Sequence, residues 1–272
     1  MTELKSNIMQ GKRGLIMGVA NDHSIAWGIA RVLAAHGAEL AFTYQGEAFG
    51  KRVKPLAEQV GSKHLLPCDV EDIESVDAVF ETLRQDWGGI DFFVHAIGFS
   101  DRNELKGLYA DTSRENFSRT MVISCFSFTE TAKRAAALMN DGGAMITLTY
   151  GGSTRVMPNY NVMGVAKAAL EASVRYLASD FGPQNIRVNA ISAGPVRTLA
   201  GAGVADARQM FNYQKRNAPL QRTVSLDEIG GSALYLLSDL GSGVTGEVHF
   251  VDSGYSTVSM PRLDELRAMD SE

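Results

Sequence analysis

Short apolar segments alternate along the chain with longer segments whose apolar residues recur at helical spacing. The short segments are rich in branched residues and nearly continuous, as expected of strands that are covered by helices on both faces. This alternation is typical of strand–helix–strand units, whose strands form a parallel sheet. Seven strands are predicted, at residues 13–20, 39–44, 63–70, 91–98, 143–150, 187–194 and 247–254. The predicted fold is therefore an α/β domain with a doubly wound parallel sheet and helices on both faces.

The segments between the strands predict how the chain is organised. Apolar residues at 25, 29, 32 and 33 form one helical face before Gly37, and those at 170, 174, 177 and 181 form another before Gly182. The chain has no low-complexity tract, long repeat or Pro/Ser-rich linker, so residues 1–272 are expected to form a single domain. Residues 195–226 show no clear period and are expected to be a functional loop. The polar residues 260–272 are expected to be a loose tail.

Composition and charge restrict the class of protein. The 272 residues are 45% hydrophobic and 21% charged, which is ordinary for a globular protein and excludes collagen, coiled-coil and disordered classes. The net charge of −5 gives no basic field for nucleic acid. No apolar run approaches the roughly 20 residues that would span a membrane. Cys68 and Cys125 lie far apart, as is typical of a reducing compartment, and no metal site is expected. We expect a cytoplasmic protein that binds neither nucleic acid nor membrane.

The end of the first strand resembles a phosphate-binding turn. Ligands of open parallel sheets bind beyond the carboxyl ends of the strands, where the first turn and the next helix offer backbone N–H groups to a pyrophosphate. Gly18 stands at this turn and Ser24 at the start of the helix. The next glycine is Gly28, so the spacing departs from G-x-G-x-x-G. The alternative is that Gly18 only relieves a tight turn and Ser24 only caps a helix.

The residues at the ends of the next strands bear on whether the cofactor is NADH or NADPH. An acidic residue after the second strand would hold the ribose of NAD, but Gln45 stands there. Gln45 can still bond ribose hydroxyls. It does not repel a 2′-phosphate, and the nearby Lys51 and Arg52 could bind one, so NADPH is not excluded. NADH is favoured and NADPH remains the alternative. Residues 69–70 and 96–98 end the third and fourth strands on the same edge, where they could hold an adenine and a ribose, although Asp69 alone would also suit a helix cap.

Tyr160 and Lys167 are the main candidates for catalysis. If both were helical, their spacing of about two turns would place them on one face, about 20° apart around the axis. A phenol and an ammonium at the cofactor edge of a sheet suit carbonyl chemistry, because one can donate to a substrate oxygen while the other holds the cofactor. The phenol carries its proton at neutral pH, and the charge of Lys167 is expected to favour the phenolate. The alternative is an exposed pair with no chemical role.

Together these motifs resemble the short-chain dehydrogenase/reductase superfamily, with its Rossmann-like fold, and within it the divergent branch of bacterial enoyl-acyl-carrier-protein reductases. The resemblance covers nearly the whole chain. It is carried by Gly18-x5-Ser24-x-Ala26-x-Gly28 in place of the usual glycine triplet, by Tyr160-x6-Lys167 in place of Tyr-x3-Lys, and by the sequence Ala-Gly-Pro-Val-Arg-Thr at 193–198.

The resemblance implies an activity and a role for each central residue. Members of this branch reduce the carbon–carbon double bond of trans-2-enoyl thioesters on acyl carrier protein, with nicotinamide hydride, in type II fatty acid biosynthesis. Tyr160 would bond the thioester carbonyl oxygen and stabilise the charge that develops on it. Lys167 would hold the nicotinamide ribose. Tyr150 would line the acyl pocket where other members of the superfamily have a serine.

The resemblance also implies cofactor, substrate and partner contacts. The positions that match cofactor contacts are Gly18, Ser24, Ile25, Gln45, Asp69, Val70, Ile97, Lys167, Val196, Arg197, Thr198, Leu199 and Ala200. Those expected at the substrate are Ser100, Tyr150, Tyr160, Met163, Ala200, Val204, Met210 and Phe211, the last ones on a lid at 195–226. A homotetramer is implied, and an acidic carrier protein would dock on Arg208, Lys215, Arg216 and Arg222, which could equally form an ordinary solvated face.

Two rival functions remain at the level of sequence. The first is a carbonyl or 3-oxoacyl reductase of the same superfamily, against which Met163, and not a tyrosine, stands four positions before Lys167. The second is a protein that binds the dinucleotide as a sensor without catalysis. The presence of both Tyr160 and Lys167 is evidence against a sensor.

Overall fold

The seven predicted strands form one parallel sheet. In the computed structural model, which describes residues 6–199 and 206–269, the strands follow the order β3-β2-β1-β4-β5-β6-β7. Every neighbouring pair is parallel. The strands are β1 Arg13–Met17, β2 Glu39–Tyr44, β3 His64–Pro67, β4 Phe92–His95, β5 Gly143–Thr149, β6 Ile186–Ala193 and β7 Val248–Val251. The strand order reverses between β1 and β4, and ligands of such sheets bind at this switch point.

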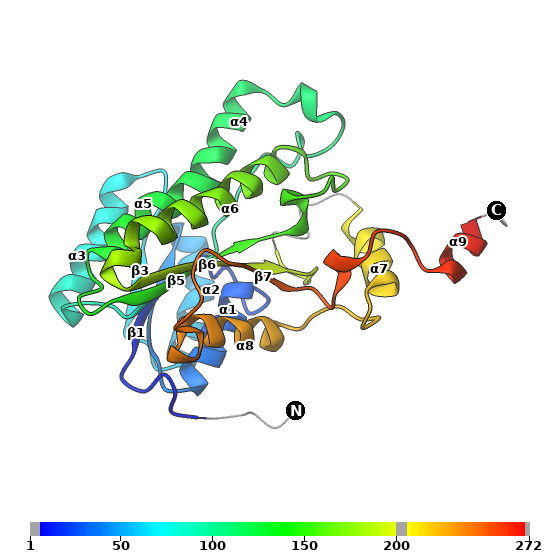
Figure 1. Cartoon of the computed structure of the whole chain (residues 1–272). Helices are drawn as coiled ribbons and strands as arrows, with labels where there is room; N and C mark the ends of the chain where they lie inside the picture. The colour runs from blue at the N-terminus through cyan, green and yellow to red at the C-terminus, as the bar shows by residue number, and fades with distance from the viewer. Residues whose placement is uncertain (1–5, 200–205, 270–272) are drawn as a thin grey trace.

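Two layers of helices cover the sheet (Figure 1). One layer contains α1 Ile25–Ala35, α2 Gly46–Gln59 and α8 Leu226–Leu237. The other contains α3 Ile73–Trp87, α4 Arg114–Met121, α5 Ser127–Ala136 and α6 Asn161–Phe181, with a π-helical turn, η2 Val122–Phe126, joining α4 to α5. Short 3₁₀ helices lie at Tyr109–Asp111, Gly151–Ser153, Gly182–Gln184, Asp239–Gly241 and Tyr255–Thr257.

Alternation along the strands builds a core on each face. In β1, Ile16 packs with Ile29 of α1 on one face, whereas Leu15 packs toward Phe128 of α5 on the other. All of these side chains are fully buried. Near-continuous apolar strands are needed because each neighbouring residue meets a different layer of helices. The sheet is therefore a fixed platform that presents the carboxyl ends of its strands on one edge.

The irregular stretch and the tail differ from the sequence prediction. Helix α7, Ala207–Asn217, lies within the stretch 195–226 that was expected to lack regular structure. Its sequence is mostly polar, and the adjacent Met210 and Phe211 do not form an apolar stripe, so the helical period is hidden. Helix α9, Leu263–Met269, lies in the expected tail and projects beyond α7 (Figure 1).

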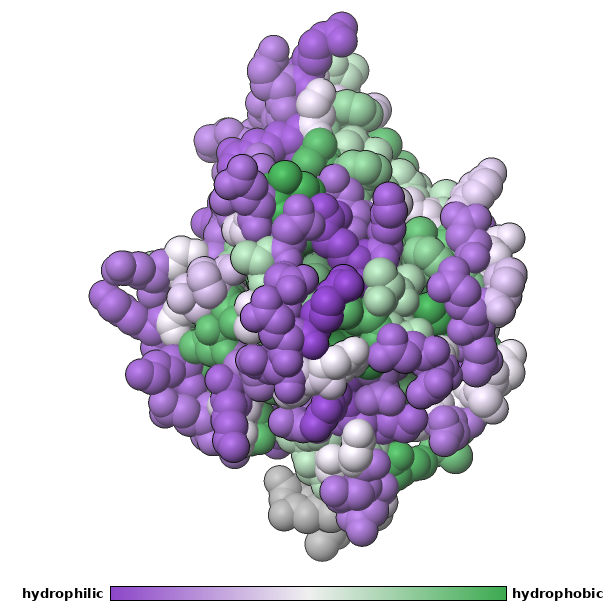
Figure 2. All heavy atoms as spheres, turned by 90° about the vertical axis from the view of Figure 1, so that its left-hand side faces the viewer, coloured by the Kyte–Doolittle hydropathy of each residue, from purple (hydrophilic) through white to green (hydrophobic). Residues whose placement is uncertain are grey.

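The surface agrees with the sequence composition. Figure 2 shows the side of the molecule on which α3 lies, where hydrophilic residues predominate and hydrophobic ones gather only in small areas. Within residues 6–199 and 206–269, no helix has the length and apolar character needed to cross a membrane.

Candidate active site

The turn after β1 is shaped by Gly18 and Ser24. Gly18 has a φ of +101°, and a Cβ atom added there would lie 2.1 Å from the carbonyl oxygen of Ala96, at the end of β4. Only glycine fits this close approach of two main chains. The Ser24 hydroxyl accepts hydrogen bonds from the N–H groups of Ala20, at 3.0 Å, and Asn21, at 3.1 Å. The turn is thus fixed at the start of α1, where the N–H groups of the first helical turn can meet an anion.

The ends of β2 and β3 are joined by a side-chain contact. Gln45 Nε2 donates to Asp69 Oδ2 at 2.9 Å, and the other carboxylate oxygen of Asp69 accepts from the N–H of Glu71 at 2.9 Å. Val70 and Ile97 are half-buried at the ends of their strands. The predicted cofactor residues that follow the first four strands therefore lie along the same edge of the sheet as Gly18.

Lys167 lies on α6, and its side chain is buried against the end of β5. Its residue surface is 8% exposed, and Nζ donates to the carbonyl oxygen of Leu148 at 2.8 Å. Burial lowers the pKa of Lys167 to about 8, although Cys125 and Glu171 oppose this shift. A Cβ atom added at Gly98 would lie 3.8 Å from Nζ, so the ammonium faces the main chain that follows β4. The alternative of an exposed lysine is therefore wrong.

Tyr160 lies directly before α6 and not within it. It is the N-cap residue of α6, and left-handed residues flank it, Asn159 at +56° and Asn161 at +30°. The two-turn helical geometry predicted for Tyr160 and Lys167 is therefore wrong. Burial raises the pKa of Tyr160, and Tyr150 and Glu171 raise it further. The expected shift toward the phenolate is thus outweighed, and the phenol keeps its proton. Backbone strain of this kind is concentrated at functional sites.

Tyr150 and Tyr160 form a pair of rings in the site. Their centroids lie 5.2 Å apart with the planes at 74°, an edge-to-face arrangement. The hydroxyl of Tyr150 accepts a hydrogen bond of 2.6 Å from Gln214 Nε2 on α7, and burial raises the pKa of Tyr150. A small hollow of about 70 Å³ adjoins Tyr150 and Gln214. Tyr150 is therefore held in place by the segment predicted to be the lid.

The remaining predicted substrate residues differ in burial and in the element on which they lie. Ser100 is buried, and its hydroxyl accepts from the Thr120 hydroxyl at 2.9 Å. Met163 is buried beneath Tyr160, in the apolar cluster that Tyr160 contacts. Met210 and Phe211 are half-buried on α7. Ala200 and Val204 lie outside the described residues.

The segment after β6 passes the same edge. Val196 and Thr198 are half-buried, whereas Arg197 and Leu199 are exposed. The N–H of Thr198 donates to the carbonyl oxygen of Val196 at 2.8 Å. Their backbone follows directly from β6 and ends where the described chain stops before α7.

Two residues of the site were not found from the sequence. Glu171 is buried one helical turn after Lys167 and accepts a hydrogen bond of 2.6 Å from the Thr149 hydroxyl. Its spacing of four from Lys167 was a usable signal. Gln214 could not be found because the period of α7 is hidden. Within the described part of the chain, no cluster of three or more His, Cys, Asp or Glu residues could hold a metal ion.

The fold and the site together define a class of protein. A parallel sheet with a glycine turn at its switch point, and a buried lysine and a protonated tyrosine on the same edge, is the arrangement of a dinucleotide-dependent reductase.

Comparison with known proteins identifies the family. The family model described as enoyl-(acyl carrier protein) reductase matches residues 18–256. "Enoyl-[acyl-carrier-protein] reductase [NADH] 2" of Rhizobium meliloti (strain 1021) is 73% identical, over 98% of this chain and 100% of the relative. The crystal structure of FabI from Candidatus Liberibacter asiaticus is 64% identical, with a TM-score of 0.93, over 94% of this chain and 100% of that one. An Anaplasma phagocytophilum enoyl-acyl-carrier-protein reductase in complex with NAD is 58% identical, with a TM-score of 0.92, over 95% and 99%.

The chain belongs to the enoyl-(acyl carrier protein) reductase family. The family, the fold class and the enzyme class predicted from the sequence are thereby confirmed, as is NADH as the cofactor.

Proposed function

We propose that this chain reduces the carbon–carbon double bond of trans-2-enoyl thioesters carried on acyl carrier protein, with NADH, in bacterial fatty acid synthesis. The observation that carries the proposal is the combination of a half-buried, protonated Tyr160 with a buried Lys167 at the glycine-lined edge of the sheet. Membership of the family supports the substrate class.

The residues present fit a dinucleotide. Gly18 leaves room at the turn, Ser24 fixes it, and the N–H groups from Ile25 onward face the pyrophosphate. Gln45 and Asp69, with the neighbouring Val70 and Ile97, bind the adenosine half. When bound, NADH supplies a hydride to the β-carbon of the substrate. Lys167 uses one N–H on Leu148 and has its other donors for the nicotinamide ribose, while residues 196–200 pass beside the nicotinamide and the pyrophosphate.

Tyr160 acts on the thioester carbonyl. As hydride reaches the β-carbon, negative charge develops on the carbonyl oxygen, and the Tyr160 hydroxyl donates a hydrogen bond to it. Burial makes this bond stronger than it would be in water, and the raised pKa keeps the proton on the phenol until it is needed. Tyr150 has a different role, because its hydroxyl already accepts from Gln214, and its ring forms a wall for the acyl chain.

Residues 195–226 form the lid over the acyl chain. Two contacts join its described part to the catalytic residues: Gln214 with Tyr150, and Asn159 Nδ2 with Asp206 Oδ2 at 3.2 Å. Met210 and Phe211 supply apolar surface from α7. A lid of this kind excludes water from the reacting atoms.

The acyl carrier protein docks on the basic residues of the lid. Arg216 already pairs with Glu265 at 2.6 Å, and Arg222 pairs with Glu228. Arg208 and Lys215 are exposed on α7, and among the described residues neither lies within 4 Å of a carboxylate. Of the four basic residues, these two are therefore the most available to an acidic partner. Neutralising both should raise KM for carrier-bound substrate and leave KM for an uncharged thioester unchanged; equal kinetics on carrier-bound substrate would contradict this docking site.

We also propose a homotetramer in the cytoplasm. Exposed apolar side chains on η2 and α6 support self-association, namely Val122, Phe126 and Tyr176, as does Phe250 on the edge strand β7. Light scattering of the purified chain tests this, and a monomer at micromolar concentration would contradict it.

One assay separates the proposed function from its rivals. Loss of NADH or NADPH absorbance is followed with a trans-2-enoyl thioester and, separately, with a 3-oxoacyl thioester. The expected result is turnover of the enoyl substrate with NADH. Turnover of only the 3-oxoacyl substrate would indicate a carbonyl reductase, and binding of NADH without turnover of either would indicate a sensor.

A further inference from the structure

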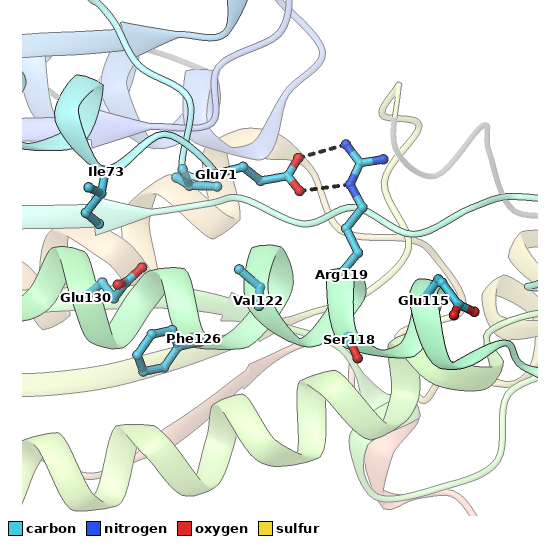
Figure 3. Close-up of a pocket in the computed structure, with 9 residues that line it drawn as sticks. Glu71, Ile73, Glu115, Ser118, Arg119, Val122, Phe126 and Glu130 are labelled. Atoms are coloured by element: carbon cyan, nitrogen blue, oxygen red, sulfur yellow. Dashed lines mark hydrogen bonds and ion pairs between the residues drawn. The ribbon is translucent and has the colours of Figure 1, made fainter.

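Arg119 on α4 forms a two-point ion pair with the loop that follows β3. Its Nε atom lies 2.9 Å from Glu71 Oε1, and its Nη2 atom lies 2.7 Å from Glu71 Oε2 (Figure 3). Glu71 is the residue directly after Val70, and its N–H is bound by Asp69. The pair therefore ties helix α4 to the segment that the proposed function assigns to the adenine.

The same guanidinium contacts the segment that follows β4. Its central carbon lies 4.8 Å from the centroid of the Phe99 ring, within the range of a cation–π interaction. The main chain of Phe99 is fixed independently, because the Ser124 hydroxyl accepts from its N–H and donates to its carbonyl oxygen, each at 2.9 Å. Ser124 lies in the π-helical turn η2, a feature often found at functional sites. The backbone of Phe99 is thus fixed, and its ring contacts the Arg119 guanidinium.

Arg119 therefore links two strand ends that are not neighbours in the sheet. Strands β2 and β1 lie between β3 and β4, so the two ends are three strand spacings apart, about 14 Å. The adenosine half of a dinucleotide lies over the ends of these first strands. An open hollow of about 630 Å³, lined by Glu71 and Ile73 on one side and by Arg119 and Val122 on the other, adjoins the link, and Val70 is also among its lining residues (Figure 3).

We propose that Arg119 is a positioning residue for the adenine end of the cofactor. The ion pair with Glu71 fixes the backbone of Asp69 and Val70, and the contact with Phe99 sets its distance from the segment containing Ile97. Two parallel N–H···O bonds fix an orientation that the single ammonium of a lysine cannot reproduce. This inference rests on the proposed function, which places the adenine between these segments.

The test compares Arg119→Met with Arg134→Met. Arg134 is the matched control because it also pairs with a carboxylate across two helices, Asp77 at 2.6 Å, but away from the strand ends. The dissociation constant of NADH is measured by fluorescence, and turnover is measured with NADH and with reduced nicotinamide mononucleotide, which lacks the adenine. We expect Arg119→Met to weaken NADH binding by about three- to tenfold. Its kcat at saturating NADH and its kcat/KM with the mononucleotide should match those of the wild type.

Further variants separate positioning from simple destabilisation. Glu71→Gln should weaken NADH binding in the same direction, and combining it with Arg119→Met should add little, because both remove one interaction. Arg119→Lys should restore only part of the affinity. Unchanged NADH affinity in Arg119→Met would overturn the inference, as would an equal loss with NADH and with the mononucleotide.

The outcome also separates this inference from the proposed function. A wild-type chain that binds no NADH would overturn both. A wild-type chain that binds NADH but reduces no enoyl thioester would overturn the proposed function alone, because the effect of Arg119 is measured on binding.

Discussion

The two sides of the site are built differently. The floor, which we define as Lys167, Tyr160, Thr149, Glu171 and His95, belongs to the sheet and to α6. Apart from Tyr160, which is half-buried, all of these residues are buried, and His95 is 0% exposed. The roof, which we define as helix α7 (Ala207–Asn217), is joined to the rest of the chain by a few polar contacts. The floor is thus fixed by burial, whereas the roof depends on single hydrogen bonds and ion pairs.

Both ring nitrogens of His95, in the floor, have hydrogen-bond partners. Its Nε2 atom lies 2.9 Å from the Ser127 hydroxyl and its Nδ1 atom 3.3 Å from the Thr147 hydroxyl. Burial lowers the pKa of His95 to about 3, and the nearby Lys167 lowers it further. The ring therefore stays neutral at physiological pH, and Lys167 is the floor residue that carries the positive charge.

The roof has three described contacts. Gln214 binds Tyr150, Asn217 Oδ1 accepts from the N–H of Arg262 at 2.9 Å, and Arg216 pairs with Glu265. Under the proposed function, we expect the floor to perform the chemistry, which requires fixed geometry, and the roof to select the acyl chain, which requires movement.

The largest expected effect comes from removing the donor in the floor. Tyr160→Phe should lower kcat by about 10²–10³-fold, as loss of one oxyanion donor does in other enzymes. The NADH dissociation constant should stay unchanged, because the phenol is not its main contact. Steady-state kinetics with a trans-2-enoyl thioester measure the effect, with Tyr176→Phe, an exposed tyrosine on α6, as the control. A kcat within about threefold of the wild type would show that Tyr160 does not stabilise the developing charge.

A second change tests how strongly burial stabilises the floor. Thr149→Val removes the hydroxyl that donates to Glu171, so a buried carboxylate loses a partner. The free energy of unfolding should fall by about 2 kcal/mol. Urea denaturation measures it. Thr82→Val is the control, because that hydroxyl bonds only a carbonyl of its own helix. An equal, small loss in both variants would mean that the Glu171 contact does not stabilise the floor.

The third prediction uses the lowered pKa of Lys167. Below the pKa of about 8 the ammonium is charged and binds the ribose, and above it the charge is lost. The affinity for NADH should therefore weaken as the pH rises through about 8, by roughly tenfold for each unit beyond the pKa at most. Fluorescence titration across this range measures it. Lys167→Met should bind NADH weakly and show no such dependence; an identical pH profile in both proteins would contradict the role of Lys167.

The smallest effect is expected in the roof. Gln214→Leu removes the hydrogen bond to Tyr150 and should raise KM for the enoyl substrate by about three- to fivefold, while kcat stays near that of the wild type. Gln209→Leu, on an exposed position of the same helix, is the control. If kcat fell and KM did not change, the roof would take part in the chemistry and the comparison would fail.

The strands, the first turn and two of the floor residues, Lys167 and Tyr160, could be predicted from the sequence. All seven strands were found, because buried parallel strands need near-continuous apolar residues, although β1, β3, β4 and β7 end several residues before their predicted limits. Gly18 and Ser24 were placed at the first turn because a close main-chain approach requires glycine and a helix start favours serine. The local conformation of Tyr160 was not predictable, because it depends on the left-handed residues on either side.

The roof was much less predictable. Helix α7 has no apolar stripe, since the residues it buries include the polar Gln214 and Asn217, which bond Tyr150 and the N–H of Arg262. Long-range pairs such as Arg119 with Glu71 are likewise invisible in sequence spacing. The roles of the cofactor and substrate residues remain predictions.

The most direct measurement of the central claim follows NADH oxidation with one trans-2-enoyl thioester by the wild type, Tyr160→Phe and Gln214→Leu under the same conditions. The predicted result is a large fall in kcat in Tyr160→Phe alone and a rise in substrate KM in Gln214→Leu alone. A full kcat in Tyr160→Phe, together with a reduced kcat in Gln214→Leu, would contradict the division between a catalytic floor and a selecting roof.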